Sequence, residues 1–115
     1  MKKLITLLLI NLSIIAFSQN IIGSWQGDLH INGQKLPLIF HITEHNKTLS
    51  SAFDSPLQNA KSIPFSSTQY HNNEITLAAD HLGITYKGKL VNKKIVGEFK
   101  QGNFVTKLDL TPHNS

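Results

Sequence analysis

The chain has 115 residues, no cysteine and a formal charge of +4, and its first eighteen residues differ in character from the rest. Two lysines precede an almost wholly apolar run from Leu4 to Phe17, and Ala16 and Ser18 supply the small residues of a cleavage site. We therefore predict a signal peptide over residues 1–18 and a secreted or periplasmic protein. Removing it leaves 97 of the 115 residues and a charge of +2, which suits one domain, residues 19–115.

The composition of the mature chain excludes several classes of function. There is no arginine, and the lysines alternate with acidic residues, so we expect no nucleic-acid partner. Without cysteine there is neither a disulfide framework nor a lipid-anchoring thiol. No apolar run long enough to span a membrane follows the signal peptide. We expect a monomer without a cofactor.

Apolar residues recur at every second position after Gln19, which is the period of a β-strand. Asn32-Gly33, the strongest short hairpin signal, separates the first two such runs. A two-residue turn there places Leu29 opposite Leu36 and Trp25 opposite Phe40, so that the apolar faces of the two strands coincide.

Two further hairpins are predicted near the C-terminus. A turn at Asn92-Lys93 places Leu90 opposite Ile95 and Tyr86 opposite Phe99. A type II′ turn at Gly102-Asn103 leads to the last strand, which Pro112 ends.

The middle of the chain is less regular. Strands are predicted over 49–53 and, after an Asn72-Asn73 turn, over 75–79, with a third near 64–70 in which Phe65 has the wrong parity unless a bulge intervenes. Residues 55–63 predict an ordered loop or one helical turn, and residues 80–83 a second loop.

About eight short strands therefore follow one another without an amphipathic helix. This pattern predicts an all-β, antiparallel up-and-down meander. Closure into a barrel removes both sheet edges, so we expect a barrel, with a two-sheet β-sandwich as the alternative.

Several motifs together resemble a known domain. They are Gly23-Ser-Trp-Gln-Gly-Asp-Leu29, Leu36-Pro-Leu-Ile-Phe-His-Ile42, Asp54-Ser-Pro-Leu-Gln-Asn-Ala60 and Ile95-Val-Gly-Glu-Phe-Lys-Gln-Gly102. In this order they resemble the small β-domain that precedes the catalytic domain in secreted α/β-hydrolases and serine hydrolases of Bacteroidetes. Leu57 and Asn59 depart from that family's pattern. The Gly23-x-Trp25 start also resembles lipocalin-like barrels, where the tryptophan lies across the closed end.

Catalytic and metal chemistry have weak signals. A serine hydrolase needs a Gly-x-Ser-x-Gly nucleophile elbow, which the sequence lacks, so we expect no enzyme activity. His41 and His45 have a ligand spacing that suits a helix, but here they fall on a strand and in the turn after it. The hairpin register sets His41 opposite Ser24 and His30 opposite Lys35 on the outer face, so we expect surface histidines and no metal.

Two sets of residues remain as candidate sites. The barrel interior is the first, either filled by its own side chains or open to a small apolar ligand. Its candidate residues are Trp25, Phe40, Phe53, Tyr86, Phe99 and Phe104. The second is a loop contact surface, because loops on rigid β-scaffolds often carry binding. Its candidate residues are Asp54, Ser55, Pro56 and Gln58; turn formation by Asp54 is the structural alternative.

The sequence thus favours a secreted, non-catalytic binding or accessory module for a small apolar ligand or a protein partner. The alternative is the detached N-terminal part of a secreted hydrolase that still serves that enzyme. A hydrolase reading frame downstream of Ser115 would distinguish the two.

Overall fold

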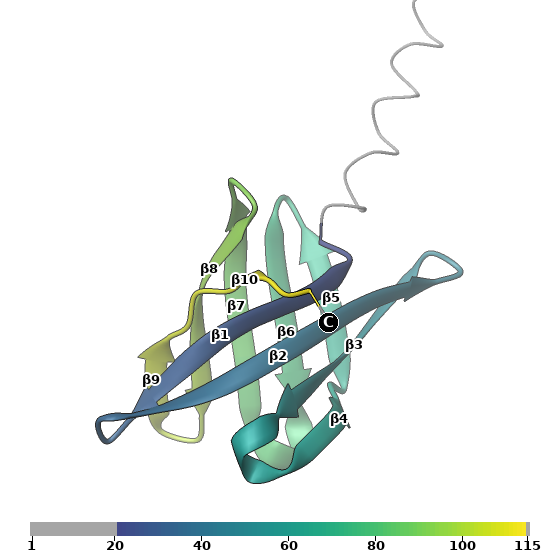
Figure 1. Ribbon diagram of the computed structural model, residues 1–115. Helices are drawn as coiled ribbons and strands as arrows, with labels where there is room; N and C mark the ends of the chain where they lie inside the picture. Colours follow the sequence, from purple (N-terminus) through teal and green to yellow (C-terminus); the bar gives the residue numbers. More distant parts are fainter. Residues whose placement is uncertain (1–20, 115) are drawn as a thin grey trace, which may run out of the picture.

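The computed structural model describes residues 21–114, which form ten strands and two single-turn 3-10 helices (Figure 1). The predicted signal peptide, residues 1–18, lies outside this range. In chain order the elements are β1 (Gly23–Ile31), β2 (Gln34–His45), β3 (Thr48–Ser55), η2 (Pro56–Gln58), β4 (Ala60–Pro64), β5 (Ser67–His71), β6 (Glu74–Ala79), η3 (Asp80–Leu82), β7 (Ile84–Val91), β8 (Lys94–Gln101), β9 (Phe104–Lys107) and β10 (Thr111–Pro112). The all-β prediction is confirmed.

The first sheet has the strand order β10-β1-β2-β3-β4, with antiparallel neighbours. The predicted register of its first hairpin is confirmed, since Leu29 lies opposite Leu36 and Trp25 opposite Phe40. Ser24 lies opposite His41, also as predicted. His45, expected in a turn, is instead the last residue of β2, because the turn falls at Asn46-Lys47.

Four of the hairpin turns begin with asparagine in the left-handed region. These residues are Asn32, Asn46, Asn72 and Asn92, with φ of 51°, 52°, 51° and 50°. The residue after each also has positive φ, which is the signature of a type I′ turn, whose twist matches that of the strands. Asparagine tolerates this conformation, so these turns follow directly from the local sequence.

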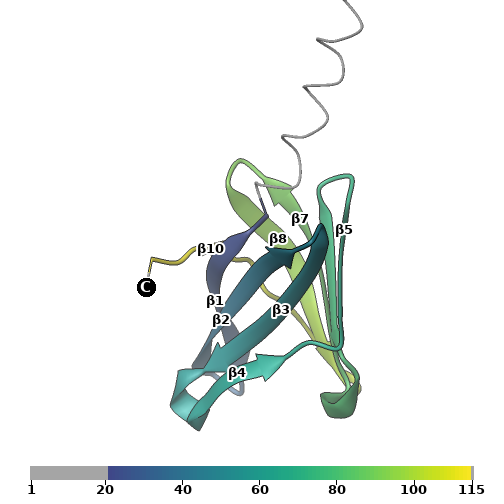
Figure 2. The same cartoon turned by 90° about the vertical axis from the view of Figure 1, so that its right-hand side faces the viewer.

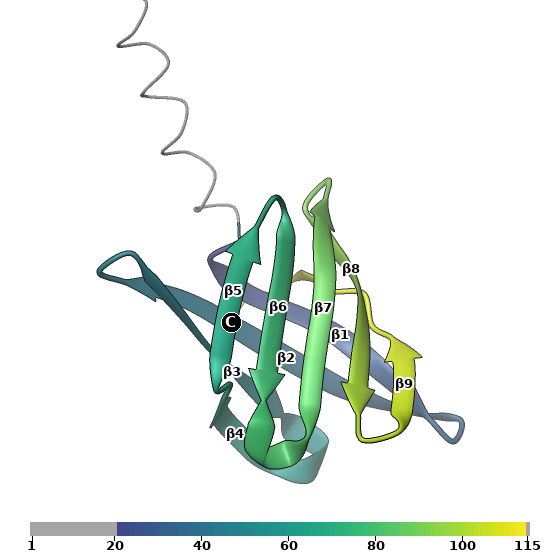
Figure 3. The same cartoon turned by 180° about the vertical axis from the view of Figure 1, so that it is seen from behind.

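The second sheet has the order β5-β6-β7-β8-β9 (Figure 3). Both predicted C-terminal pairs are confirmed: Leu90 opposite Ile95, and Tyr86 opposite Phe99. Gly102 has φ of 59° and Asn103 has no positive φ, as the predicted type II′ turn requires.

The chain changes sheets at Phe65. We predicted one irregular strand near 64–70, but β4 ends at Pro64 in the first sheet and β5 begins at Ser67 in the second. Phe65 lies at this corner, between the two strands, so it need not follow the inward-outward alternation of either one. Its ring is nevertheless buried, with 8% exposure. Residues 55–63 contain the expected helical turn, η2, and also the unexpected strand β4.

The prediction of a closed barrel is wrong, and the sandwich alternative fits. The strands form two separate antiparallel sheets, which cross steeply and face each other (Figures 1 and 2). The seam beside β1 fails to close because β10 pairs with Trp25 and Gln26 alone. Upstream of β10, Leu110 pairs with Ile95 of β8, so this segment belongs to the other sheet.

The interior between the sheets is filled around Tyr86, which is fully buried. Its hydroxyl donates a hydrogen bond to the Leu108 carbonyl oxygen at 2.7 Å. Burial and the nearby Asp109 carboxylate both raise the pKa of Tyr86, so the hydroxyl remains a donor. A Cβ on Gly97 or Gly88 would lie within 3 Å of this hydroxyl, so these glycines make room for the tyrosine and not for a guest.

Candidate functional site

One end of the sandwich carries an apolar groove of about 580 Å³, here called the open-end groove. Figure 2 shows the sheets further apart at the end that carries the turns after β3 and β6 than at the end where β1 begins. Three residues that line the open-end groove are polar, Gln58, His81 and Gln101. The others are apolar: Leu29, Ile31, Leu36, Leu38, Phe40, Phe53, Ala60, Ile63, Phe65, Leu82, Ile84 and Phe99. This volume and composition are typical of a small-molecule site.

The floor of the open-end groove is part of an aromatic cluster, in which Phe40, Phe53 and Phe65 line the groove and Tyr86 packs against Phe40 without lining it. The ring centroid of Phe40 lies 5.3 Å from those of Phe65 and Tyr86 and 6.3 Å from that of Phe53, in edge-to-face arrangements. Such geometry is favourable for aromatic pairs and fixes the rings in place. The groove therefore has a rigid base that does not depend on a ligand.

The predicted interior residues divide into three groups. Phe40, Phe53 and Phe99 line the groove. Trp25 and Tyr86 are buried but do not line it; the Trp25 indole Nε1–H donates to the Ile21 carbonyl oxygen at 3.0 Å, outside the groove. Phe104 was expected inside and is 37% exposed, because it begins β9 at the tip of the last hairpin, where its partner Gln101 is exposed too.

Of the four predicted loop residues, only Gln58 lines the groove. Pro56 starts η2, where its fixed φ suits the first position of a helical turn. Ser55 is fully buried at the end of β3, and its hydroxyl donates to Oε1 of Gln58 at 2.7 Å. This bond holds the Gln58 amide at the mouth of the groove.

Asp54 lies outside the groove and fastens the loop that forms one of its walls. Its Oδ2 lies 2.8 Å from His41 Nε2, and its Oδ1 accepts a hydrogen bond from the Ser62 amide at 2.7 Å. Ser62 is held at φ of 56°, a conformation rare for serine. Two hydrogen bonds lower the pKa of Asp54, and the bond with His41 has a larger effect than the bond from the Ser62 amide. The turn-forming interpretation of Asp54 is thus supported by the geometry.

His41 also lies 2.8 Å from the Ser24 hydroxyl through Nδ1, which completes a chain of hydrogen bonds Ser24–His41–Asp54. The order is that of a serine-hydrolase triad, with the two imidazole nitrogens exchanged. All three side chains lie on the outer face of the first sheet, on three adjacent strands. The hairpin register predicts the Ser24–His41 pair, whereas the contact between His41 and Asp54 was not predicted, because the register of β3 could not be derived.

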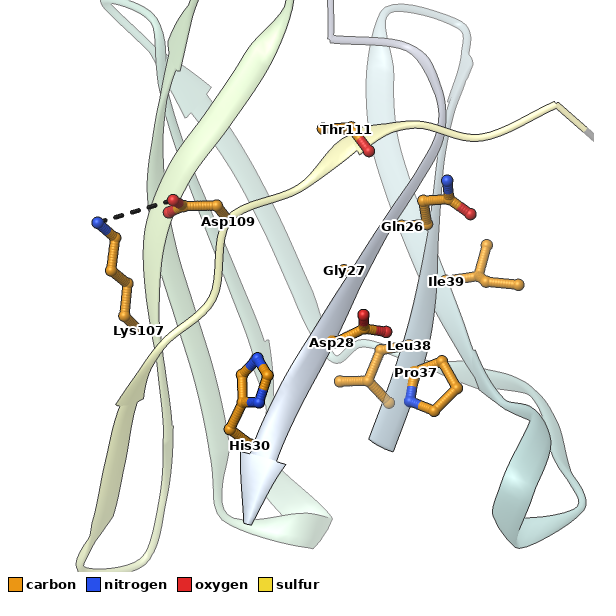
Figure 4. Close-up of a pocket in the computed structure, with 10 residues that line it drawn as sticks. All are labelled: Gln26, Gly27, Asp28, His30, Pro37, Leu38, Ile39, Lys107, Asp109 and Thr111. Carbon is orange, nitrogen blue, oxygen red and sulfur yellow. Dashed lines mark ion pairs between the residues drawn. The ribbon is translucent and has the colours of Figure 1, made fainter. Parts of the chain in front are cut away.

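A second groove follows the open seam between β1 and the C-terminal segment (Figure 4). Asp28 and His30 on β1 and Lys107 and Asp109 on the facing segment border it, with 3.7 Å between Lys107 Nζ and Asp109 Oδ2. Its volume, about 590 Å³, is close to that of the open-end groove, but six of its ten lining residues are polar and four of these are ionisable. It offers less apolar surface to a ligand than the open-end groove does.

Residues that sequence reasoning missed complete the open-end groove. Ala60 and Ile63 come from the unexpected strand β4, and His81 and Leu82 from η3. The sequence does carry a signal for the end of η3, the glycine Gly83, which adopts a φ of 67°. Which side chains of η3 would face the other sheet depended on how the sheets cross.

Neither family models, nor curated proteins, nor solved structures match this chain. Across residues 21–114, no group of three or more histidine or acidic side chains could hold a metal ion. The same part of the chain contains no helix long and apolar enough to cross a membrane.

Proposed function

We propose that this protein is a secreted, non-catalytic binding module that holds a small apolar molecule in the open-end groove. The observation that carries the proposal is the composition of that groove, which is apolar except for Gln58, His81 and Gln101 and rests on a packed aromatic floor. Binding is favourable when a ligand displaces water from an apolar surface of this extent.

A hydrolase function is less well supported by the same structure. Ser24 lies within strand β1, not at a strand-to-helix turn, and a nucleophile requires neighbouring N–H groups aimed at the oxyanion. Strands β1 and β2 direct their amides along the sheet to neighbouring strands. Asp54 is engaged by Ser62 as well as by His41, which suits a structural role.

An uncharged fluorescent dye such as Nile red tests the binding function. We expect saturable binding with an increase in dye emission, because the groove would exclude water from the dye. Trp25 does not line the groove, so dye emission and not tryptophan quenching is the appropriate signal. A titration that rises linearly, without saturation, would contradict the proposal.

A pair of matched variants locates the binding site. Ala60→Phe places a ring in the groove, whereas Ala78→Phe places the same ring on the second sheet, outside the groove. We expect the first to weaken dye binding at least tenfold and the second to leave it unchanged, with both unfolding cooperatively. If both variants bound the dye equally well, the dye would bind outside the open-end groove.

The resemblance to the hydrolase-associated domain favours a second function, that of an accessory domain for a secreted hydrolase. In its support, the two motifs containing His41 and Asp54 lie side by side on β2 and β3. A hydrolase gene adjacent to this one, whose purified product co-elutes with this chain, would support it. Absence of both would leave the independent binding module.

A further inference from the structure

The edge of strand β1 that faces the seam is only partly covered. Strand β10 pairs with it at Trp25 and Gln26 alone. Before β10 the chain runs along β8 instead, since the backbones of Leu110 and Ile95 bond to each other in both directions, at 2.7 and 2.9 Å. In the part of the chain that the structure describes, the edge of β1 beyond Gln26 therefore has no neighbouring strand.

Asp28 and His30 direct their backbone groups to this uncovered edge. Successive residues of an antiparallel strand bond alternately to the neighbours on its two sides. The Ser24 carbonyl oxygen accepts from the His113 amide at 2.8 Å, on the β10 side, so every second residue after Ser24 faces that side too. Pro37, opposite Asp28 on β2, has no N–H to donate, which agrees with this alternation. Two amides and two carbonyl oxygens are thus available to a further strand.

The second groove, here called the seam groove, lies beside these backbone groups and has more carboxylates than ammonium groups. Asp28 and Asp109 line it with a single lysine, Lys107 (Figure 4). The Asp109 carboxylate already has two partners, because Oδ2 lies 3.7 Å from Lys107 Nζ and Oδ1 accepts from the Gly97 amide at 3.2 Å. Asp28 is exposed and forms no ion pair within residues 21–114. A basic group placed opposite Asp28 would complement this carboxylate.

A strand added antiparallel to β1 would have a defined order of side chains. Its residues opposite Asp28 and His30 would each exchange two hydrogen bonds with β1 and would point to the outer face, on which Asp28 is exposed. The residue between them, opposite Leu29, would point inward, because Leu29 is 3% exposed. An apolar side chain suits that position.

We propose that the free edge of β1 binds an extended peptide segment of another protein by strand addition, with a basic residue opposite Asp28 and an apolar residue opposite Leu29. A second copy of this chain fits this edge less well. A symmetric pairing of two β1 strands about Leu29 would place Asn32 of the second copy opposite Gln26, where Thr111 already pairs. The proposal does not rest on a ligand in the open-end groove.

An NMR titration of the isotope-labelled protein with the acetylated and amidated peptide Thr-Val-Thr-Val-Lys tests strand addition. We expect saturable shifts of the Asp28 and His30 amide resonances, with a Kd of about 0.1–1 mM for so small an interface. N-methylation of the peptide's lysine removes a hydrogen bond to Asp28 and should weaken binding at least fivefold. N-methylation of the valine before it, whose N–H would face away from β1, should change the affinity less than twofold.

Variants of the protein test the charge complementarity. Asp28→Asn should weaken binding of the lysine peptide about threefold and leave that of a peptide with norleucine in place of lysine unchanged. Glu44→Gln, the same loss of charge at the exposed end of β2, should leave both affinities unchanged. A peptide with glutamate in place of lysine should bind at least fivefold more weakly than the lysine peptide.

Several results would overturn strand addition at β1. These are the absence of saturable shifts, equal weakening by the two N-methyl groups, and equal binding of the lysine and glutamate peptides. Dimerisation through β1 without peptide, seen by analytical ultracentrifugation together with loss of the Asp28 amide signal on dilution-dependent exchange, would assign the edge to a second copy instead. Nile red reports on the open-end groove, so failure of the peptide to bind leaves the proposed function standing, and the reverse also holds.

Discussion

The Nε2 atom of His41 lies 2.8 Å from Oδ2 of Asp54, although the two residues are thirteen positions apart in the chain. The side chain of Asp54 is 16% exposed, so the carboxylate needs these partners. Its other oxygen accepts from Ser62, beyond η2. The pair therefore connects the outer face of the first sheet to the loop that walls the open-end groove.

Removing the charge of Asp54 should loosen this loop. Asp54→Asn keeps an oxygen for the Ser62 amide but weakens the bond to His41, and we expect a loss of about 1–2 kcal/mol in the free energy of unfolding. Asp28→Asn, at an exposed position on β1, should change it by less than about 0.5 kcal/mol. Urea unfolding at neutral pH measures both. Equal effects would remove the structural role assigned to Asp54.

The same carboxylate predicts how stability depends on pH. Its pKa in the folded state lies below the ordinary value of 3.8, so the folded state favours the ionised form. This contribution is fully present above that value and is lost as the pH falls through the lower folded pKa. The stability difference between wild type and Asp54→Asn should therefore shrink below about pH 4. A difference that stays constant down to pH 2 would contradict the lowered pKa.

Gly97 should be intolerant of a methyl group. Its Cβ would overlap the Tyr86 hydroxyl and approach the Lys87 carbonyl oxygen at 2.7 Å, and we expect Gly97→Ala to cost about 2–4 kcal/mol. Tyr86→Phe removes the hydroxyl and leaves the Leu108 carbonyl unpaired, at about 1–2 kcal/mol. Combined, the two should cost less than their sum, because the phenylalanine relieves part of the clash. Strict additivity in thermal unfolding would contradict this contact.

Trp25 should contribute strongly to stability without contributing to ligand affinity. Its ring is 5% exposed, and Trp25→Ala should cost about 3–5 kcal/mol. Trp25→Phe should retain most of the stability and all of the Nile red affinity, since the ring lies outside the groove. A loss of dye binding in the folded phenylalanine variant would place the ligand near Ile21 instead.

Two phenylalanines on the two strands of one hairpin should behave differently. Phe99→Ala removes a ring that is 4% exposed and should cost about 3–5 kcal/mol, whereas Phe104→Ala should cost less than about 1 kcal/mol. Phe99 also lines the groove, so the dye affinity of its variant should fall while that of the Phe104 variant stays near wild type. Similar costs for both would place Phe104 inside the sandwich.

Local patterns were sufficient for the hairpins. Asparagine-initiated turns and alternating apolar residues act between neighbours in the chain, so Trp25 opposite Phe40 and Tyr86 opposite Phe99 could be derived without the tertiary structure. Strand β4 was missed because Lys61 and Ser62 interrupt its alternation, and an edge strand buries too little to enforce that alternation.

The sequence by itself determined most of the strands, the registers of the first and the C-terminal hairpins and the direction in which most of their side chains face, because each depends on contacts between chain neighbours. Only the tertiary structure decided that the meander divides into two sheets at Phe65, and that the C-terminal segment leaves β8 for β1. The open-end groove follows from that division. Its walls, from η2 and η3, approach each other through the crossing of two sheets, which no local spacing encodes.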